Sequence, residues 1–197
     1  MGRIVVMNHV TLDGVMQGPG RADEDTRGGF TRGGWGARSA DDATGRAMGE
    51  RMAAGGGLAG WLFGRRTYED LLGYWNRQPD SPFGPALNNS PKYVASRSLE
   101  EPLPWPNSTL LQGEAADAVA ALKARTEGVL AIMGSGELIH SLLAHDLIDE
   151  LLLMIHPLVL GSGKRLLPEG VHLWLELIAS EATPTGVVIA TYEVARG

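Results

Sequence analysis

The sequence predicts an α/β fold: a mixed, mainly parallel sheet flanked by helices, with antiparallel strands at the C-terminal end of the chain. Short apolar or β-branched runs alternate with helix-forming segments, and the last strand-like runs follow one another without helices between them. That order is typical of a parallel sheet with an antiparallel edge. The chain has 197 residues, 44% of them hydrophobic, and contains no repeat or linker. We therefore expect one domain spanning residues 1–197.

The first half of the chain supplies two buried strands and two helices. Residues 4–10 are a β-branched run that predicts a strand buried on both faces. A long polar, glycine-rich stretch follows through Gly36, and loops of this length in compact domains are usually functional or disordered. A helix is expected over 41–54, because two acids suit its positive N-terminus and glycines 55–57 end it. A strand over 58–63 and a short helix over 67–72 come next.

The second half continues the alternation. The Pro- and Asn-rich residues 80–91 are expected to form a connection, and three prolines keep 99–107 extended between strands at 93–96 and 109–111. A helix over 114–125 begins with acids and ends with basic residues. A strand over 129–133 then leads into a helix over 137–144, and the expected strands 150–156, 173–180 and 187–192 complete the chain.

Composition and charge exclude several classes of function. The 17 Lys and Arg against 23 Asp and Glu give a net charge of −6, which argues against a nucleic-acid-binding surface. The absence of cysteine excludes disulfides, thiolate metal sites and thiol nucleophiles, and the five histidines show no metal-ligand spacing, so we expect no metal site. The apolar run in residues 1–10 is too short to predict a signal peptide, and no apolar stretch reaches the ~18–20 residues that would span a bilayer. We expect a soluble cytoplasmic protein with a small-molecule substrate and no membrane partner.

Phosphate-binding groups follow three of the expected strands. Gly134-Ser135-Gly136-Glu137 joins a strand to a helix N-terminus, whose free N–H groups bind anions; an ordinary tight turn is the alternative. Arg65-Arg66-Thr67 follows a second strand, where guanidiniums can bind phosphate or pair with carboxylates such as Glu69. Ser96-Arg97 follows a third. Because the carboxyl ends of parallel strands meet at one edge, these segments together predict an extended ligand with several phosphates, such as a dinucleotide.

In this order, the segments resemble the dihydrofolate reductase superfamily, and in particular the reductase domain that ends bacterial bifunctional riboflavin-biosynthesis deaminase-reductases. The motifs that carry the resemblance are Val10-Thr-Leu-Asp-Gly14, Gly64-Arg-Arg-Thr-Tyr-Glu69, Lys92-Tyr-Val-Ala-Ser-Arg97, Met133-Gly-Ser-Gly-Glu-Leu138, Leu147-Ile-Asp-Glu-Leu151 and His156-Pro-Leu-Val-Leu-Gly-Ser-Gly163. The resemblance covers nearly the whole chain, and the order of the motifs is more specific than any one of them. It implies a dihydrofolate reductase-like fold and a homodimer.

The resemblance also implies that NADPH is the cofactor. The residues expected to hold its pyrophosphate and adenosine end are Arg65, Arg66 and Thr67. Those expected to accept its 2′-phosphate are Ser96 and Arg97. Those expected to lie under the pyrophosphate are Gly134, Ser135, Gly136 and Glu137. The turn of Gly161, Ser162 and Gly163 is expected to line the nicotinamide and substrate side.

Three carboxylates are candidates for the chemistry. Dihydrofolate reductases place a carboxylate early in their first long helix, a few residues after a tryptophan; here Trp35 precedes Asp41 and Asp42. Either acid could orient a substrate N–H or relay a proton, with burial raising its pKa, or could merely complement the helix dipole. Asp13, in the Leu-Asp-Gly turn, could bond to backbone or contact the substrate.

Together these features predict an NADPH-dependent oxidoreductase that transfers a hydride to an electrophilic carbon of a small heterocyclic or ribosylamino substrate. The resemblance implies 5-amino-6-(5-phosphoribosylamino)uracil, an intermediate of riboflavin biosynthesis, as that substrate. Dihydrofolate is the alternative substrate. A noncatalytic NADP(H)-binding sensor is the alternative class of function.

Overall fold

The computed structural model describes residues 1–54 and 56–195. Its strands are β1 (Arg3–Thr11), β2 (Leu58–Gly64), β3 (Lys92–Ala95), β4 (Ser108–Leu111), β5 (Val129–Ile132), β6 (Glu150–His156), β7 (Leu175–Ala182) and β8 (Val188–Val194). Its helices are α1 (Asp42–Ala54), α2 (Arg65–Trp75), α3 (Phe83–Asn89), α4 (Ala115–Arg125) and α5 (Gly136–Leu143), with short 3-10 turns η1 (Arg27–Gly29) and η2 (Trp35–Ser39). None of the helices in these described residues is long and apolar enough to span a membrane.

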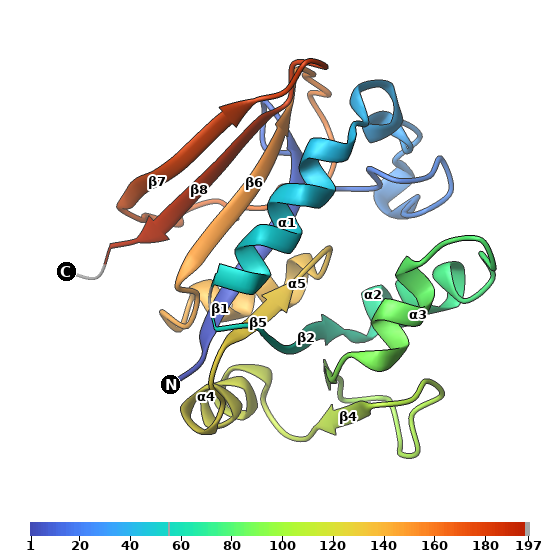
Figure 1. Ribbon diagram of the computed structural model, residues 1–197, viewed down its shortest axis with the longest axis vertical. Helices are drawn as coiled ribbons and strands as arrows, with labels where there is room; N and C mark the ends of the chain where they lie inside the picture. Colours follow the sequence, from blue (N-terminus) through green and yellow to red (C-terminus); the bar gives the residue numbers. More distant parts are fainter. Residues whose placement is uncertain (55, 196–197) are drawn as a thin grey trace.

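The strands form one sheet in the order β4-β3-β2-β5-β1-β6-β8-β7 (Figure 1). Strands β1 to β6 pair in parallel, whereas β8 is antiparallel to both β6 and β7. The predicted mixed, mainly parallel sheet with antiparallel C-terminal strands is therefore confirmed. The fully buried β5 lies at the centre of the parallel part, as expected for a strand that is covered on both faces.

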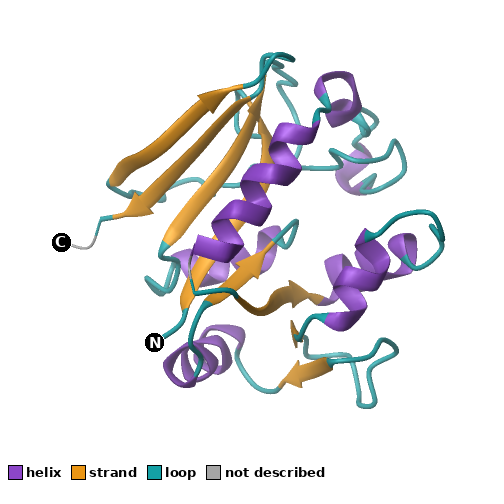
Figure 2. Cartoon of the chain, viewed as in Figure 1, coloured by secondary structure: helices purple, strands orange, loops and turns teal. Residues whose placement is uncertain are grey.

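Helices cover both faces of the sheet (Figure 2). On one face, Met48 of α1, Tyr68 of α2 and Leu87 of α3 pack against the strands. On the other face, Leu122 of α4 and Ile139 of α5 do the same. Each helix thus buries an apolar stripe, which is the main source of its stability in a protein of this kind.

One expectation about the connections is wrong, and another is narrowed to one of its two alternatives. The stretch 80–91 contains a helix, α3, because Pro82 occupies its N-cap and Pro85 its first turn, where a missing N–H costs no helical hydrogen bond. The long segment after β1, expected to be functional or disordered, is ordered around a small hydrophobic cluster, the loop cluster, formed by Val15, Phe30, Trp35 and Leu160; a functional role for the segment stays a prediction. Gly55, expected to follow the first helix, lies outside the described residues.

At the carboxyl edge of the sheet, the chain leaves the neighbouring strands β2 and β5 toward opposite faces. β2 leads directly into α2 on one face, and β5 turns through Gly134 and Ser135 into α5 on the other face. Since β2 and β5 are neighbours, the N-termini of these two helices begin side by side and separate. Ligands of open α/β sheets bind at such points.

Candidate functional site

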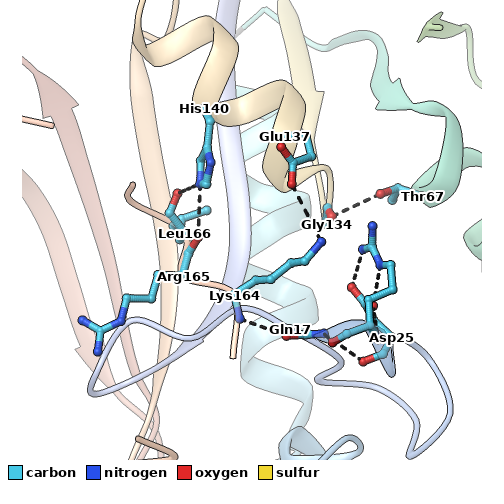
Figure 3. Close-up of polar contacts among 10 residues, drawn as sticks. Gln17, Asp25, Thr67, Gly134, Glu137, His140, Lys164, Arg165 and Leu166 are labelled. Carbon is cyan, nitrogen blue, oxygen red and sulfur yellow. Dashed lines mark hydrogen bonds and ion pairs between the residues drawn. The ribbon is translucent and has the colours of Figure 1, made fainter. Parts of the chain in front are cut away.

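The turn after β5 is tied to both neighbouring strands. Gly134 N–H donates to Asn8 Oδ1 of β1 at 3.2 Å. Thr67 Oγ1 donates to Gly134 O at 3.1 Å (Figure 3). The Gly64 N–H at the end of β2 donates to Ser135 Oγ at 3.0 Å. Gly134 has φ +69°, a conformation that favours glycine. The ends of β1, β2 and β5 are therefore held together as one rigid surface.

The helices that begin at this surface keep their N-termini open to an anion. Ser135 occupies the N-cap of α5 but makes no capping bond, because its hydroxyl accepts from Gly64 instead. Gly64, the N-cap of α2, has no side chain with which to cap. Uncapped N–H groups and the positive ends of two helix dipoles attract negative charge.

Two arginines begin α2, and a third follows the neighbouring strand β3. Arg65, with 41% of its side chain exposed, pairs with Glu69 at 3.3 Å, and Arg66 is exposed. Arg97 follows β3, the neighbour of β2; its side chain is 85% exposed and lies 3.8 Å from Glu114. Exposed ion pairs of this kind contribute little, so a phosphate can replace the carboxylate partner.

The structure thus brings the three sequence-predicted segments to adjacent strand ends on β3, β2 and β5. Within them, Ser96 Oγ accepts from the N–H groups of Ser98 and Leu99, each at 3.1 Å, which shapes the turn that carries Arg97. Glu137 is exposed on the first turn of α5, and Lys164 Nζ lies 3.8 Å from its carboxylate (Figure 3). The Lys164 ammonium reduces the negative charge that Glu137 presents beside the helix N-terminus.

Asp13 joins the end of β1 to the 160–163 turn. Its carboxylate accepts from Thr11 Oγ1 at 2.6 Å, from Leu160 N–H at 3.1 Å and from Gly161 N–H at 2.7 Å. The Thr11 hydroxyl above all, together with the Gly161 and Leu160 N–H groups, lowers the pKa of Asp13 to about 2. Asp13 is therefore ionised at neutral pH and has the backbone bonds of a structural residue; a substrate contact stays a prediction.

The 161–163 turn packs beside the loop cluster. Gly163 has φ +121°, and a Cβ there would meet Val15 Cγ1 at 2.7 Å and a Phe30 ring carbon at 2.9 Å, so only glycine suits this position. Ser162 is exposed. Buried Gln17 holds the same region together, because its Oε1 accepts from Lys164 N–H at 2.9 Å and its Nε2 donates to Asp25 O at 3.1 Å (Figure 3).

The two acids at the start of α1 differ in environment. Asp42 is exposed, whereas Asp41 Oδ1 accepts from Ala43 N–H at 3.0 Å and Oδ2 accepts from Thr185 Oγ1. The expected rise of the pKa of Asp41 through burial is wrong, because hydrogen bonds from Thr185 and Thr183 lower it. Asp41 thus stabilises the start of α1 and joins it to the β7–β8 hairpin; a role for either acid in proton transfer stays a prediction.

Sequence reasoning did not single out Asn8 or His9. Both interrupt the apolar run of β1, and polar residues inside a buried strand are the signal that could have found them. Two cavities of the described residues, of about 420 and 560 Å³, lie elsewhere: one beside Arg3 and Glu193, the other along residues 101–108. Neither coincides with the strand ends, so we assign the candidate site on the chemistry of those ends.

Comparison with known proteins gives one family and several solved structures. The family model described as the RibD C-terminal domain matches residues 3–189. A comparison with curated protein sequences gives no match.

Three solved structures illustrate the likeness. A protein described as a riboflavin biosynthesis protein, from Shewanella sp. PV-4, is 25% identical, with complete coverage of both chains and a TM-score of 0.66. Dihydrofolate reductase from Enterococcus faecalis, solved with NADP(H), is 15% identical over 98% of this chain and 95% of its own, with a TM-score of 0.59. A deaminase/reductase from Thermotoga maritima is 14% identical over 98% of this chain and 57% of its own, with a TM-score of 0.63. The last two share the fold.

Proposed function

The chain belongs to the RibD C-terminal domain family, and from that premise we propose that it is an NADPH-dependent reductase of a small heterocyclic or ribosylamino substrate. The family and the structural neighbours support a reductase of the kind that acts in riboflavin biosynthesis. The observation that carries the proposal is the set of three adjacent strand ends, each with groups that bind phosphate. A ligand that uses all three needs phosphates in more than one place, which a dinucleotide phosphate has.

The residues at the edge suit this cofactor. The uncapped N-termini of α2 and α5 would take the pyrophosphate, with Thr67, Ser135 and Gly136 beside it. Arg97, whose exposed guanidinium pairs with Glu114 at the surface, would take the 2′-phosphate. When bound, NADPH would supply a hydride from its nicotinamide ring. The contribution of the protein is to hold and orient the reacting groups.

The substrate we propose is 5-amino-6-(5-phosphoribosylamino)uracil. The support is the family together with the Thermotoga maritima neighbour, whose name includes reduction of this compound. Dihydrofolate is the second candidate, favoured by the shared fold with the Enterococcus faecalis enzyme. A noncatalytic NADP(H)-binding sensor would bind the cofactor and turn over neither compound.

Calorimetric titration with NADPH and NADH side by side tests the cofactor. We expect micromolar binding of NADPH, about −8 kcal/mol, and clearly weaker binding of NADH, because only NADPH carries the 2′-phosphate. No heat and no thermal stabilisation with either would contradict the proposal. NADPH absorbance with each candidate substrate then separates the enzymatic alternatives from the sensor.

A further inference from the structure

Three polar groups form a hydrogen-bonded line beside the candidate site. Ser39 Oγ lies 2.6 Å from His156 Nδ1, and His156 Nε2 lies 2.8 Å from His9 Nδ1. Ser39 is 8% exposed and His156 is 2% exposed, while His9 is half-buried. The Trp35 ring packs edge-on against His156, with the ring centroids 5.1 Å apart. The line therefore begins in the interior, at the end of η2, and ends at a ring that solvent can reach.

The hydrogen-bond partners decide which ring nitrogens carry protons. Within residues 1–54 and 56–195, the hydroxyl of Ser39 has only one hydrogen-bonding partner, His156 Nδ1. A buried O–H without an acceptor is costly, so Ser39 donates and Nδ1 of His156 accepts. A neutral His156 then carries its proton on Nε2 and donates to His9 Nδ1. Because Nδ1 of His9 accepts this hydrogen bond, a neutral His9 carries its single proton on Nε2.

Both rings are neutral at physiological pH. Burial, and secondarily the neighbouring His156, lower the pKa of His9 to about 4. Burial also lowers the pKa of His156, although Asp41 acts in the opposite direction. In the part of the chain that the structure describes, no atom accepts a hydrogen bond from His9 Nε2. His9 therefore presents an uncharged N–H donor whose acceptor is still to be supplied.

His9 is close to the surface that the candidate cofactor residues form. Its neighbour Asn8 accepts from the N–H of Gly134, and Asn8 and His9 point to opposite faces because consecutive strand residues alternate. Met7 lies on the face covered by α1, α2 and α3, so His9 lies on that face as well. A ligand held at the β5 turn and extending across the end of β1 on this face would meet His9.

We propose that His9 is a catalytic residue which, as a neutral imidazole, donates a hydrogen bond from Nε2 to the substrate atom that gains negative charge during reduction. The inference rests on the reductase function proposed above. When the electrophilic carbon gains the hydride, a new C–H bond forms, the double bond from that carbon to nitrogen or oxygen opens, and its electron pair moves to the heteroatom. His9 stabilises that heteroatom until it takes a proton from solvent, and the nicotinamide is left oxidised. A neutral imidazole can serve as an electrophile in this way.

His156 and Ser39 are positioning residues in this arrangement, since they act only through His9. Removing the Ser39 hydroxyl takes away the donor that His156 Nδ1 has among the described residues, so the tautomer that leaves a proton on His9 Nε2 is no longer enforced. Ser39→Ala should therefore lower kcat less than a substitution of His9. It should also change the ring-nitrogen spectrum of both histidines.

The experiment combines a spectrum with kinetics. Two-bond ¹H–¹⁵N spectra of the histidine rings in the wild-type protein should show unprotonated Nδ1 and protonated Nε2 in both His9 and His156. His9→Gln should lower kcat with NADPH and 5-amino-6-(5-phosphoribosylamino)uracil by about 100-fold, with the Kd of NADPH within about twofold. The matched control is His145→Gln, an exposed histidine after α5, which should leave both constants unchanged.

The outcomes separate this inference from the proposed function. Failure of the wild-type protein to bind NADPH would defeat the proposed function, whereas unchanged kcat in His9→Gln would defeat only the role of His9. Protonated Nδ1 in His9 would overturn the tautomer argument. If the wild-type protein binds NADPH without turnover, adding the uracil compound to the NADP⁺ complex must shift the His9 Nε2 resonance; a resonance that stays in place overturns the proposal.

Discussion

Acidification is expected to destabilise the protein through His9. The pKa of this imidazole is 6.5 when unperturbed and about 4 in the folded protein, where burial and His156 disfavour the charged ring. As the pH falls, His9 takes up a proton in the unfolded chain before it does so in the folded protein. The free energy of unfolding therefore decreases. The contribution of His9 is therefore fully present above pH 6.5 and is lost progressively as the pH falls from 6.5 through about 4.

The magnitude follows from the two pKa values. At about 1.36 kcal/mol per pKa unit, the difference between 6.5 and about 4 corresponds to about 3 kcal/mol of unfolding free energy. His156 faces His9 from β6, and Asp41 acts on His156 from the start of α1. A loss of about 3 kcal/mol is a large fraction of the ~5–15 kcal/mol that stabilises a typical domain.

Urea unfolding at a series of pH values between 7 and 4 measures this loss. Other acids also titrate, so the wild-type protein is compared with His9→Gln and with His145→Gln, in which the exposed histidine is the control. We expect the loss of unfolding free energy in His9→Gln to be smaller by about 3 kcal/mol, and that in His145→Gln to equal the wild-type loss. Parallel curves for the wild-type protein and His9→Gln would refute the reasoning, because the folded and unfolded pKa values of His9 would then be equal.

Three further predictions test the site and the assembly. Arg97→Ala should raise the Kd of NADPH by about 10- to 100-fold in calorimetry and leave the Kd of NADH within about twofold. The control is Arg125→Ala, at another exposed arginine. Equal losses of affinity for the two cofactors would remove Arg97 from the 2′-phosphate site. Ser135→Ala leaves the Gly64 N–H without its acceptor and should cost about 1–3 kcal/mol in urea unfolding, whereas no measurable cost would show that this bond is dispensable. The homodimer stays a prediction: sedimentation velocity should show a dimer that Ile178→Lys weakens, since Ile178 is 57% exposed on the edge strand β7, and a wild-type monomer would exclude it.

Local patterns in the sequence predicted most of the elements. The runs that became β1, β2 and β5 are mainly apolar, and those of β1 and β5 are also rich in β-branched residues. They are bounded by glycine or polar residues, so their positions follow from local chemistry. The helix α3 was missed because proline interrupts a helix unless it lies in the first turn. Only the packing of Leu87 of α3 in the core shows that the prolines lie at the start of a helix. The pKa of Asp41 was misjudged for a similar reason, since Thr185 lies 144 residues away along the chain.

The sequence by itself determined the order of the strands and of the helices other than α3, and the phosphate-binding groups at three strand ends, because both are properties of short contiguous segments. Only the tertiary structure decided that Ser39, His156 and His9 form one line, since they are separated by 117 and 147 residues. Their contact depends on the parallel register of β1 against β6, which brings Thr11 opposite His156, and on the loop cluster that seats η2 against them. A hydrogen-bonded line assembled from distant segments has no local signature, so the neutral donor at His9 becomes visible only in the folded chain.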